Sequence, residues 1–167
     1  LNTIATVCGE GDAAKAEALV LKFSEFLRNT FGRKEEMVTL REEMAFVDTY
    51  LYIETARFGK RLTVVKNIEA GDKGLDAKVP ILVLQPLVEN AVKHGVSKRT
   101  EGGTVWITVR ADGDGLEFEI ADNGPGKGEG FFKSLFKGEA AADDVGIGVK
   151  NIHERLVQLY GERCGLQ

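Results

Sequence analysis

Apolar residues recur three and four positions apart in the first third of the chain, which predicts amphipathic helices. The first predicted helix lies between Asp12 and Phe31. The second begins with a capping-box signature at Thr39 and Glu42 and ends near Gly59. The apolar stripes are Ala16, Leu19, Phe23, Phe26 and Thr30 in the first helix and Leu40, Met44, Val47 and Leu51 in the second. Two such helices joined by a short loop predict an antiparallel hairpin, whose stripe either packs internally or forms a dimerisation bundle.

The pattern changes after Lys60, where runs of β-branched residues predict strands. The predicted strands are Arg61–Ile68, Thr104–Arg110 and Leu116–Ala121. The run Asp112-Gly113-Asp114-Gly115 between the last two predicts a hairpin turn. Pro80–Gly95 keeps near-helical spacing and is expected to be a helix, in which Pro86 either introduces a kink or marks the start.

The end of the chain is predicted to contain a long loop and a helix. Residues 123–145 are rich in glycine and include three phenylalanines, Phe131, Phe132 and Phe136, so this stretch is expected to be a long mobile loop, either a lid or disordered. Those phenylalanines cover a ligand, contact a partner or are buried, and burial is the commonest fate. The final helix is expected from about Gly148 to Tyr160.

Composition narrows the functional classes. The 167 residues are 43% hydrophobic and 29% charged, with a net charge of -4, which suits a soluble acidic protein and gives no basic surplus for a nucleic-acid partner. Cys8 and Cys164 lie far apart and are expected to be free thiols in a reducing compartment. The most apolar stretch, Val79–Val88, is too short to cross a bilayer. Because the chain opens at Leu1, we expect a piece of a longer protein, with any membrane segment outside it.

Three short motifs carry the candidate chemistry, and their order is more specific than any one of them. Glu89-Asn90-Ala91-Val92-Lys93-His94 lies on a predicted helix. Asp122-Asn123-Gly124-Pro125-Gly126 follows a predicted strand directly. Gly146-Ile147-Gly148-Val149-Lys150-Asn151 is expected to open the last helix. A strand end, a helix and a glycine-rich helix start together favour a nucleotide site.

The residue types fit the two ends of ATP. The carboxylate of Asp122 is expected to be buried and to accept a hydrogen bond from the adenine amine, while Gly124 and Gly126 let the purine approach the backbone. Gly146 and Gly148 are expected to lie just before the last helix, where backbone N–H groups at the helix start suit phosphate oxygens. Two further side chains suit the charged end of the nucleotide: Asn90 as an amide-oxygen ligand for Mg²⁺ and Lys93 as a partner for phosphate.

These motifs resemble those of the LytS-like sensor histidine kinases over essentially the whole chain. Leu84–Gly95 resembles their N box, and residues 122–126 and 146–152 resemble their G1 and G2 boxes. In the helical part, the similar segments are Leu1–Ile4, Leu40–Glu43, Tyr50–Glu54 and Arg57–Gly59.

The resemblance implies an α+β fold, in which a helical dimerisation and phosphotransfer segment (residues 1–59) precedes a two-layer ATP-binding domain of the Bergerat type (residues 60–167). It implies a cytoplasmic, homodimeric kinase core that uses ATP and Mg²⁺ and passes phosphate to a response regulator. The residues implied for the site are Asn90 for Mg²⁺, and Lys93, His94, Asp122, Gly124, Gly126, Gly146, Ile147 and Gly148 for ATP. Glu89 either acts as a base or orients Lys93, and we favour the second role.

The sequence departs from the family at several places. The phosphoacceptor histidine is expected just upstream of Leu1, so this chain alone is expected not to autophosphorylate. We expect His94 to contact phosphate or pack locally, and His153 to be a solvated surface residue. Lys127 stands where the family has an apolar residue beside adenine. The family continues past residue 167 with two further strands, so the sheet is expected to lack an edge.

Two other functions fit the same motifs. One is an ATPase or ATP-gated clamp, related to topoisomerases and Hsp90-like chaperones. Against it, Pro86 occupies the place one helical turn before Asn90 where those relatives carry a catalytic carboxylate. The other is a non-catalytic nucleotide-binding dimerisation module, against which the retained Asp122 and the glycines argue.

Overall fold

The computed structural model describes residues 2–31, 35–113, 115–126, 144–162 and 164–166. Its helices are α1 (Asn2–Gly9), α2 (Ala13–Phe31), α3 (Leu40–Phe58), α4 (Gly71–Leu75), α5 (Gln85–Asn90) and α7 (Asp144–Tyr160). Its strands are β1 (Met37–Thr39), β2 (Leu62–Ile68), β3 (Lys78–Pro80), β4 (Gly103–Asp112) and β5 (Gly115–Asp122). Single turns of tighter or wider helix are η1 (Gly59–Arg61), η2 (Ala91–Gly95) and η3 (Val96–Lys98). The fold is α+β, as predicted.

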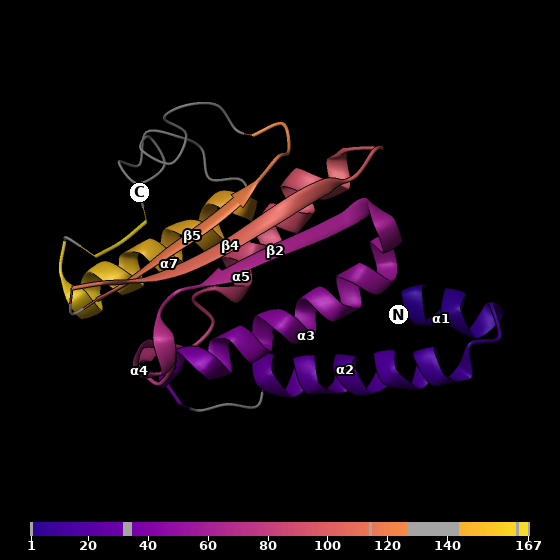
Figure 1. Cartoon of the computed structure of the whole chain (residues 1–167), viewed down its shortest axis with the longest axis horizontal. Coiled ribbons are helices and arrows are strands. Elements are labelled where there is room, and N and C mark those ends of the chain that lie inside the picture. The colour runs from indigo at the N-terminus through magenta and orange to yellow at the C-terminus, as the bar shows by residue number, and fades with distance from the viewer. Residues whose placement is uncertain (1, 32–34, 114, 127–143, 163, 167) are drawn as a thin grey trace.

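The predicted helical hairpin is present, since α2 and α3 lie side by side (Figure 1). Thr39 accepts a hydrogen bond from the Glu42 N–H and the Glu42 carboxylate accepts one from Thr39 N–H, so the capping box is confirmed. Gly59 ends α3 with φ 57°, a conformation that glycine adopts without steric cost. The short helix α1, which the sequence pattern did not predict, packs on α2.

The main sheet has the order β2-β4-β5. β2 and β4 are parallel, with Leu62 opposite Gly103, so a crossover connection joins them. β4 and β5 form the predicted antiparallel hairpin, in which Asp112 lies opposite Gly115. The N-box segment lies inside the crossover, between two neighbouring strands of the sheet.

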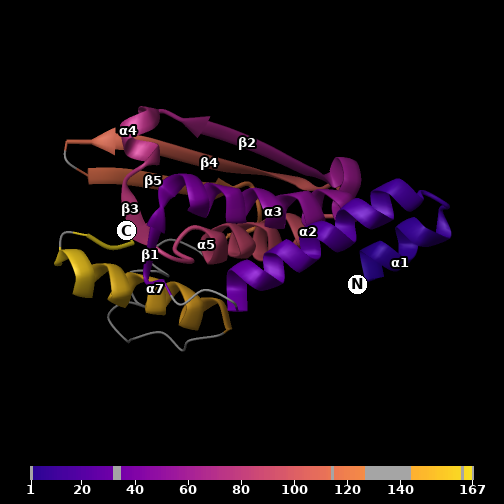
Figure 2. The ribbon, with the colours of Figure 1, turned by 90° about the horizontal axis from the view of Figure 1, so that it is seen from below.

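The core lies between the sheet and the helices α3, α5 and α7, all on one side of the sheet (Figure 2). Alternate residues of β4, Val105, Ile107 and Val109, are fully buried on that side. Leu40 and Val47 of α3 belong to the same core. In contrast, α1 and α2 share a separate small cluster, Val7, Ala16 and Leu19. The sheet therefore packs directly on α3 but not on α2.

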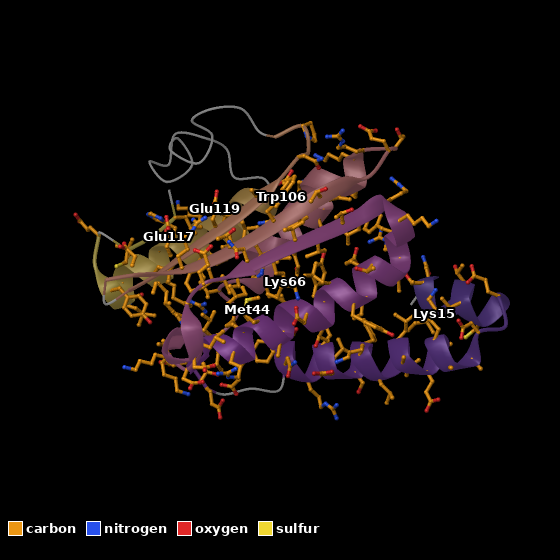
Figure 3. The ribbon with its side chains drawn as sticks, viewed as in Figure 1. Lys15, Met44, Lys66, Trp106, Glu117 and Glu119 are labelled. Carbon is orange, nitrogen blue, oxygen red and sulfur yellow. The ribbon has the colours of Figure 1, made fainter. Side chains whose placement is uncertain are left out.

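Polar contacts add to this packing. Lys66 of β2, labelled in Figure 3, forms an ion pair with Asp48 of α3. On the opposite face of the sheet the side chains are exposed or half-buried, and Trp106 there is 39% exposed. Within the described ranges, none of the helices combines the length and the apolar character that crossing a bilayer requires.

The structure corrects the prediction of one helix over Pro80–Gly95. Lys78–Pro80 is instead a strand, β3, which pairs antiparallel with β1, and residues 81–84 form a turn. The helix begins at Gln85 with Pro86 in its first turn, where a missing N–H costs nothing. Pro86 therefore marks a helix start rather than a kink. The β1–β3 pair was missed because three-residue strands are too short to show alternation.

The last helix was also predicted too short. It begins at Asp144, four residues before the predicted start. Of the predicted lid, residues 123–126 are described and form the turn after β5, whereas residues 127–143 lie outside the described residues. The predictions about Lys127, Phe131, Phe132 and Phe136 fall in that stretch.

Candidate functional site

The N-box segment is a helix with one buried face and one open face. Val88, Ala91 and Val92 are buried in the core, which fixes the rotation of α5 and η2. Asn90 is consequently half-buried and Lys93 exposed. From Ala91 to Gly95 the helix widens into a single π turn, a feature often found at functional sites. The polar residues predicted for the charged end of a nucleotide therefore lie off the core, on a rigidly packed helix.

The G1 turn begins where β5 ends. Asp122 is exposed, and its Oδ1 accepts a hydrogen bond from the Gly124 N–H at 2.8 Å. Sequence reasoning described this carboxylate as buried, which is wrong. Its exposure leaves it accessible to a ligand, while the bond to Gly124 holds its orientation. Gly126 has φ 65°, in the region that glycine favours.

Asn123 has a role that the sequence analysis missed. Its Oδ1 accepts a hydrogen bond from the Thr104 N–H at 2.8 Å, and its own N–H donates to the Thr104 carbonyl. Arg99 also donates to the Asn123 carbonyl. Asparagine side chains often make such contacts with nearby backbone groups, so the residue type could have indicated this role. These bonds fasten the G1 turn to the first residues of β4.

The N box and the G1 turn are in direct contact at Gly95. A Cβ on Gly95 would fall 2.2 Å from Asp122 Oδ1, and a Cβ on Gly124 would fall 2.2 Å from the Cα of Gly95. No side chain fits at either position without displacing backbone or carboxylate. The structure thus brings together two motifs that are separated by 26 residues in the sequence, between Gly95 and Asp122. Together they form a cradle of bare backbone beside an accessible carboxylate.

The G2 segment lies within α7 and not before it. Gly146 and Ile147 are in the first turn of the helix, and Gly148 is in the second. The prediction that both glycines precede the helix is therefore wrong. Since only the first four N–H groups of a helix lack an internal partner, Gly146 keeps the geometry expected for a phosphate contact and Gly148 does not. A Cβ on Gly148 would meet nothing within 4 Å.

The helix α7 packs beside α5 and leaves a cleft of about 250 Å³ between them. The residues that line this cleft are Leu82, Pro86, Gly148, Asn151, Ile152 and Arg155. Pro86 and Asn90 are four residues apart, so they share one stripe of the helix. Asn90 therefore lies on the side of α5 that faces α7 and the G2 segment.

Glu89 lies on a different side of the same helix. It lines a second cleft, of about 160 Å³, between the N box and the C-terminal half of α3. Its Oε1 accepts a hydrogen bond from Gln85 Nε2 at 2.8 Å. Tyr50 and Glu54 of α3 line this cleft too, and burial raises the pKa of both, while the Arg57 guanidinium opposes the shift at Glu54. Lys93 also lines it, so Glu89 and Lys93 share this cleft.

The two histidines occupy distinct environments. His94 is half-buried in η2, beside the residues that meet the G1 turn. The Nδ1 of His153 accepts a hydrogen bond from the Leu166 N–H at 3.1 Å, and His153 is half-buried. The prediction that His153 is a solvated surface residue is therefore wrong, because residues 164–166 fold back on it.

Comparison with known proteins places this geometry in a family. Residues 1–62 match the model of the histidine kinases, and residues 76–166 match that of the histidine kinase-, DNA gyrase B- and HSP90-like ATPases. The sensor histidine kinase BtsS of Escherichia coli is 36% identical over 166 residues, which cover 99% of this chain and 27% of that protein. The sensor protein LytS of Staphylococcus haemolyticus is 32% identical over 170 residues, covering 99% of this chain and 28% of that protein.

A third relative, the sensor histidine kinase YpdA of Escherichia coli, is 32% identical over 148 residues, covering 88% of this chain and 25% of that protein. The chain thus spans roughly a quarter of the length of these relatives. The match over nearly its whole length, together with the N-box, G1 and G2 segments, confirms the resemblance seen in the sequence. The chain belongs to the LytS-like sensor histidine kinases and carries their ATPase-like domain.

Proposed function

We propose that this chain is the kinase core of a two-component sensor, which binds ATP with Mg²⁺ and transfers the γ-phosphate to a histidine and then to a response regulator. The observation that carries the proposal is the contact of Gly95 with Asp122 and Gly124. It places an accessible carboxylate beside bare backbone at the end of the N-box helix. A flat, hydrogen-bonding base fits such a cradle.

At the adenine end, Asp122 accepts a hydrogen bond from the exocyclic amine. Its Oδ1 is held by the Gly124 N–H, so the carboxylate is oriented before any ligand binds. Asn123 keeps this turn on β4 through its bonds to Thr104. Gly124 and Gly126 let the purine approach the main chain.

At the phosphate end, Asn90 holds Mg²⁺ through its amide oxygen. No group of three or more acidic, histidine or cysteine side chains able to hold a metal occurs within the described residues. The single amide oxygen of Asn90 fits Mg²⁺, which takes few protein ligands and binds mainly phosphate oxygens and water. Lys93 and the first-turn N–H of Gly146 neutralise phosphate charge, and Ile147 and Gly148 shape this side of the site. Bound ATP·Mg²⁺ supplies the transferable phosphoryl group.

The acceptor in this proposal is a histidine outside the 167 residues. A neutral imidazole is already nucleophilic near pH 7, so the site has to position the groups and exclude water rather than supply a strong base. Glu89 orients Lys93, which fits their shared cleft. His94, half-buried next to the G1 turn, contacts phosphate or supports the turn.

The partners follow from the same proposal. The exposed apolar residues Val20, Leu21 and Leu27 of α2 support homodimerisation through the helices of residues 1–59. Residues 60–167 then form the ATP-binding domain. A response regulator receives the phosphate, and the core lies in the cytoplasm, where ATP and regulators are present.

Calorimetric titration with ADP and with ATP, in the presence of Mg²⁺, tests the proposal. Wild-type protein is expected to bind, and Asp122→Ala is expected to lose at least tenfold in affinity, since a charged hydrogen bond is worth about 1.5–3 kcal/mol. Asp112→Ala is the matched control, because Asp112 lies at the other end of the same hairpin. Absence of binding by folded wild-type protein, or equal loss in both variants, contradicts the adenine role of Asp122.

A further inference from the structure

A fully buried carboxylate connects helix α3 to the start of the N box. Glu43, in the first turn of α3, is 0% exposed. Its Oε1 accepts a hydrogen bond from the Leu82 N–H, and its Oε2 accepts bonds from the Val83 and Leu84 N–H groups at 3.1 and 3.0 Å. Three consecutive amides of one turn therefore converge on a single side chain from another element.

The turn that Glu43 holds leads straight into the nucleotide helix. Leu82 has φ 57°, the one positive φ of a non-glycine residue among the described residues. A leucine rarely adopts that conformation, which persists only where surrounding contacts enforce it. Helix α5 begins at Gln85, directly after the third bonded amide, and carries Asn90. A shift of the turn would therefore also move the start of the helix that carries Asn90, the predicted Mg²⁺ ligand.

The same turn is held from the opposite side by α7. Arg155 Nη2 donates a hydrogen bond to the Ile81 carbonyl at 2.6 Å. Burial raises the pKa of Glu43, and the three amide bonds together with the charge of Arg155 oppose that shift. The turn 81–84 thus lies between α3 and the helix that contains the G2 segment.

A purely structural role would require only that Glu43 satisfy three amides in the core, because a buried N–H group left without an acceptor is costly. What distinguishes Glu43 is its set of bonds, all made to the segment that precedes Asn90. We propose that Glu43 is a positioning residue, through which helix α3 sets the place of the N-box helix and hence the affinity for nucleotide. This inference rests on the proposed nucleotide-binding function.

Glu43→Gln tests the proposal with little change in volume. The amide keeps one acceptor oxygen but turns an NH₂ donor toward backbone N–H donors, so at least one of the three bonds is lost. Val47→Ala is the matched control, because Val47 is also 0% exposed on α3 but makes no hydrogen bond to the turn through its side chain. It is expected to lower the melting temperature without moving the turn.

Two measurements decide the matter. In calorimetry with ADP and Mg²⁺, at a temperature where both variants are folded, Glu43→Gln is expected to weaken binding roughly tenfold and Val47→Ala less than twofold. In hydrogen exchange without nucleotide, Glu43→Gln is expected to speed exchange over residues 82–95, and Val47→Ala is not. If Glu43→Gln does not fold, Glu43→Asp, which keeps the charge but shortens the reach, is expected to show both effects in weaker form.

Equal affinities in the two variants, or faster exchange confined to residues 82–84, would overturn the positioning role. Failure of the wild type to bind nucleotide is a separate outcome. It contradicts the proposed function, and the exchange measurement then still shows whether Glu43 fixes the N-box helix.

Discussion

Gly95 and Gly124 lie so close that a Cβ on Gly124 would overlap the Cα of Gly95 at 2.2 Å. This contact joins the end of the N-box helix to the turn after β5. It shows that glycine is needed at Gly124 for packing between two protein segments, whether or not a purine also approaches there. The site therefore depends on a tight backbone contact that any side chain would open.

Gly95→Ala is expected to disrupt this contact. The new Cβ would lie 2.2 Å from Asp122 Oδ1, so the carboxylate or the helix has to move. We expect a loss of about 1–3 kcal/mol in the free energy of unfolding, as for other overpacked sites, and a clear loss of ADP affinity. Denaturant unfolding and calorimetry measure the two effects.

Gly9→Ala is the control, since a Cβ there meets nothing within 4 Å and Gly9 lies at the end of α1. Equal stability of Gly95→Ala and Gly9→Ala would show that a Cβ fits between Gly95 and Asp122, and would contradict the tight contact between the two residues.

Asn123→Ala is expected to release the G1 turn from β4. The Thr104 N–H loses its partner, which costs about 1 kcal/mol, and Asp122 loses a fixed neighbour. Asn123→Asp keeps an acceptor oxygen and is expected to retain more of the stability. Thermal unfolding of the two variants beside the wild type checks this, and indistinguishable melting temperatures for Ala and Asp would exclude the proposed bond.

The raised pKa of Tyr50 predicts that the stability of the protein falls with rising pH in the alkaline range. Burial, with smaller contributions from Glu54 and Glu89, raises the pKa of Tyr50 in the folded state, whereas the unfolded phenol ionises near pH 10. Above that pH the unfolded state binds fewer protons, so the free energy of unfolding falls by up to about 1.4 kcal/mol per pH unit. Below pH 10 the contribution is fully present.

Tyr50→Phe removes this titration. The stability difference between wild type and Tyr50→Phe is therefore expected to be constant from pH 8 to 9 and to shift against the wild type between pH 10 and 11. Urea unfolding at each pH gives the values, and parallel profiles across the whole range would mean that Tyr50 ionises normally.

The Glu89→Gln variant tests whether Glu89 acts as a base or orients Lys93. Glutamine keeps an oxygen that can accept a hydrogen bond from Lys93 in the cleft that both side chains line, so we expect the variant to bind ADP nearly as the wild type does. Slow release of inorganic phosphate from ATP, unchanged by Glu89→Gln, is the expected result. Fast release that the variant abolishes would instead favour an ATPase in which Glu89 activates water.

Much of the fold was predictable because local patterns and tertiary packing agree. The capping box at Thr39, the β4–β5 hairpin and the stripe on α3 were each read from residue type and spacing, and each is confirmed. The errors lie where tertiary contacts override local preference. Leu82 is held in a conformation that leucine avoids by bonds to Glu43, from a residue far away in the chain.

The residues of the candidate site could be predicted from the sequence, but the contacts between its segments could not. Asp122 and Gly124 were expected to serve a ligand, yet the contact with Gly95 and the bonds of Asn123 depend on how two distant segments meet. Sequence spacing cannot report such distances. The roles of Asn90, Lys93 and the G2 glycines toward nucleotide stay predictions.

The parallel pairing of β2 with β4 has a consequence for how the protein folds. The N-box helix is part of the connection that this pairing closes, and the G1 turn follows the next strand. Closing so long a connection costs chain entropy before any contact is gained, which makes such pairings slow. The nucleotide cradle is therefore expected to form late in folding, after β2 and β4 have paired. Nucleotide present during refolding would then bind only molecules that have already folded, and it would not speed the folding of the others.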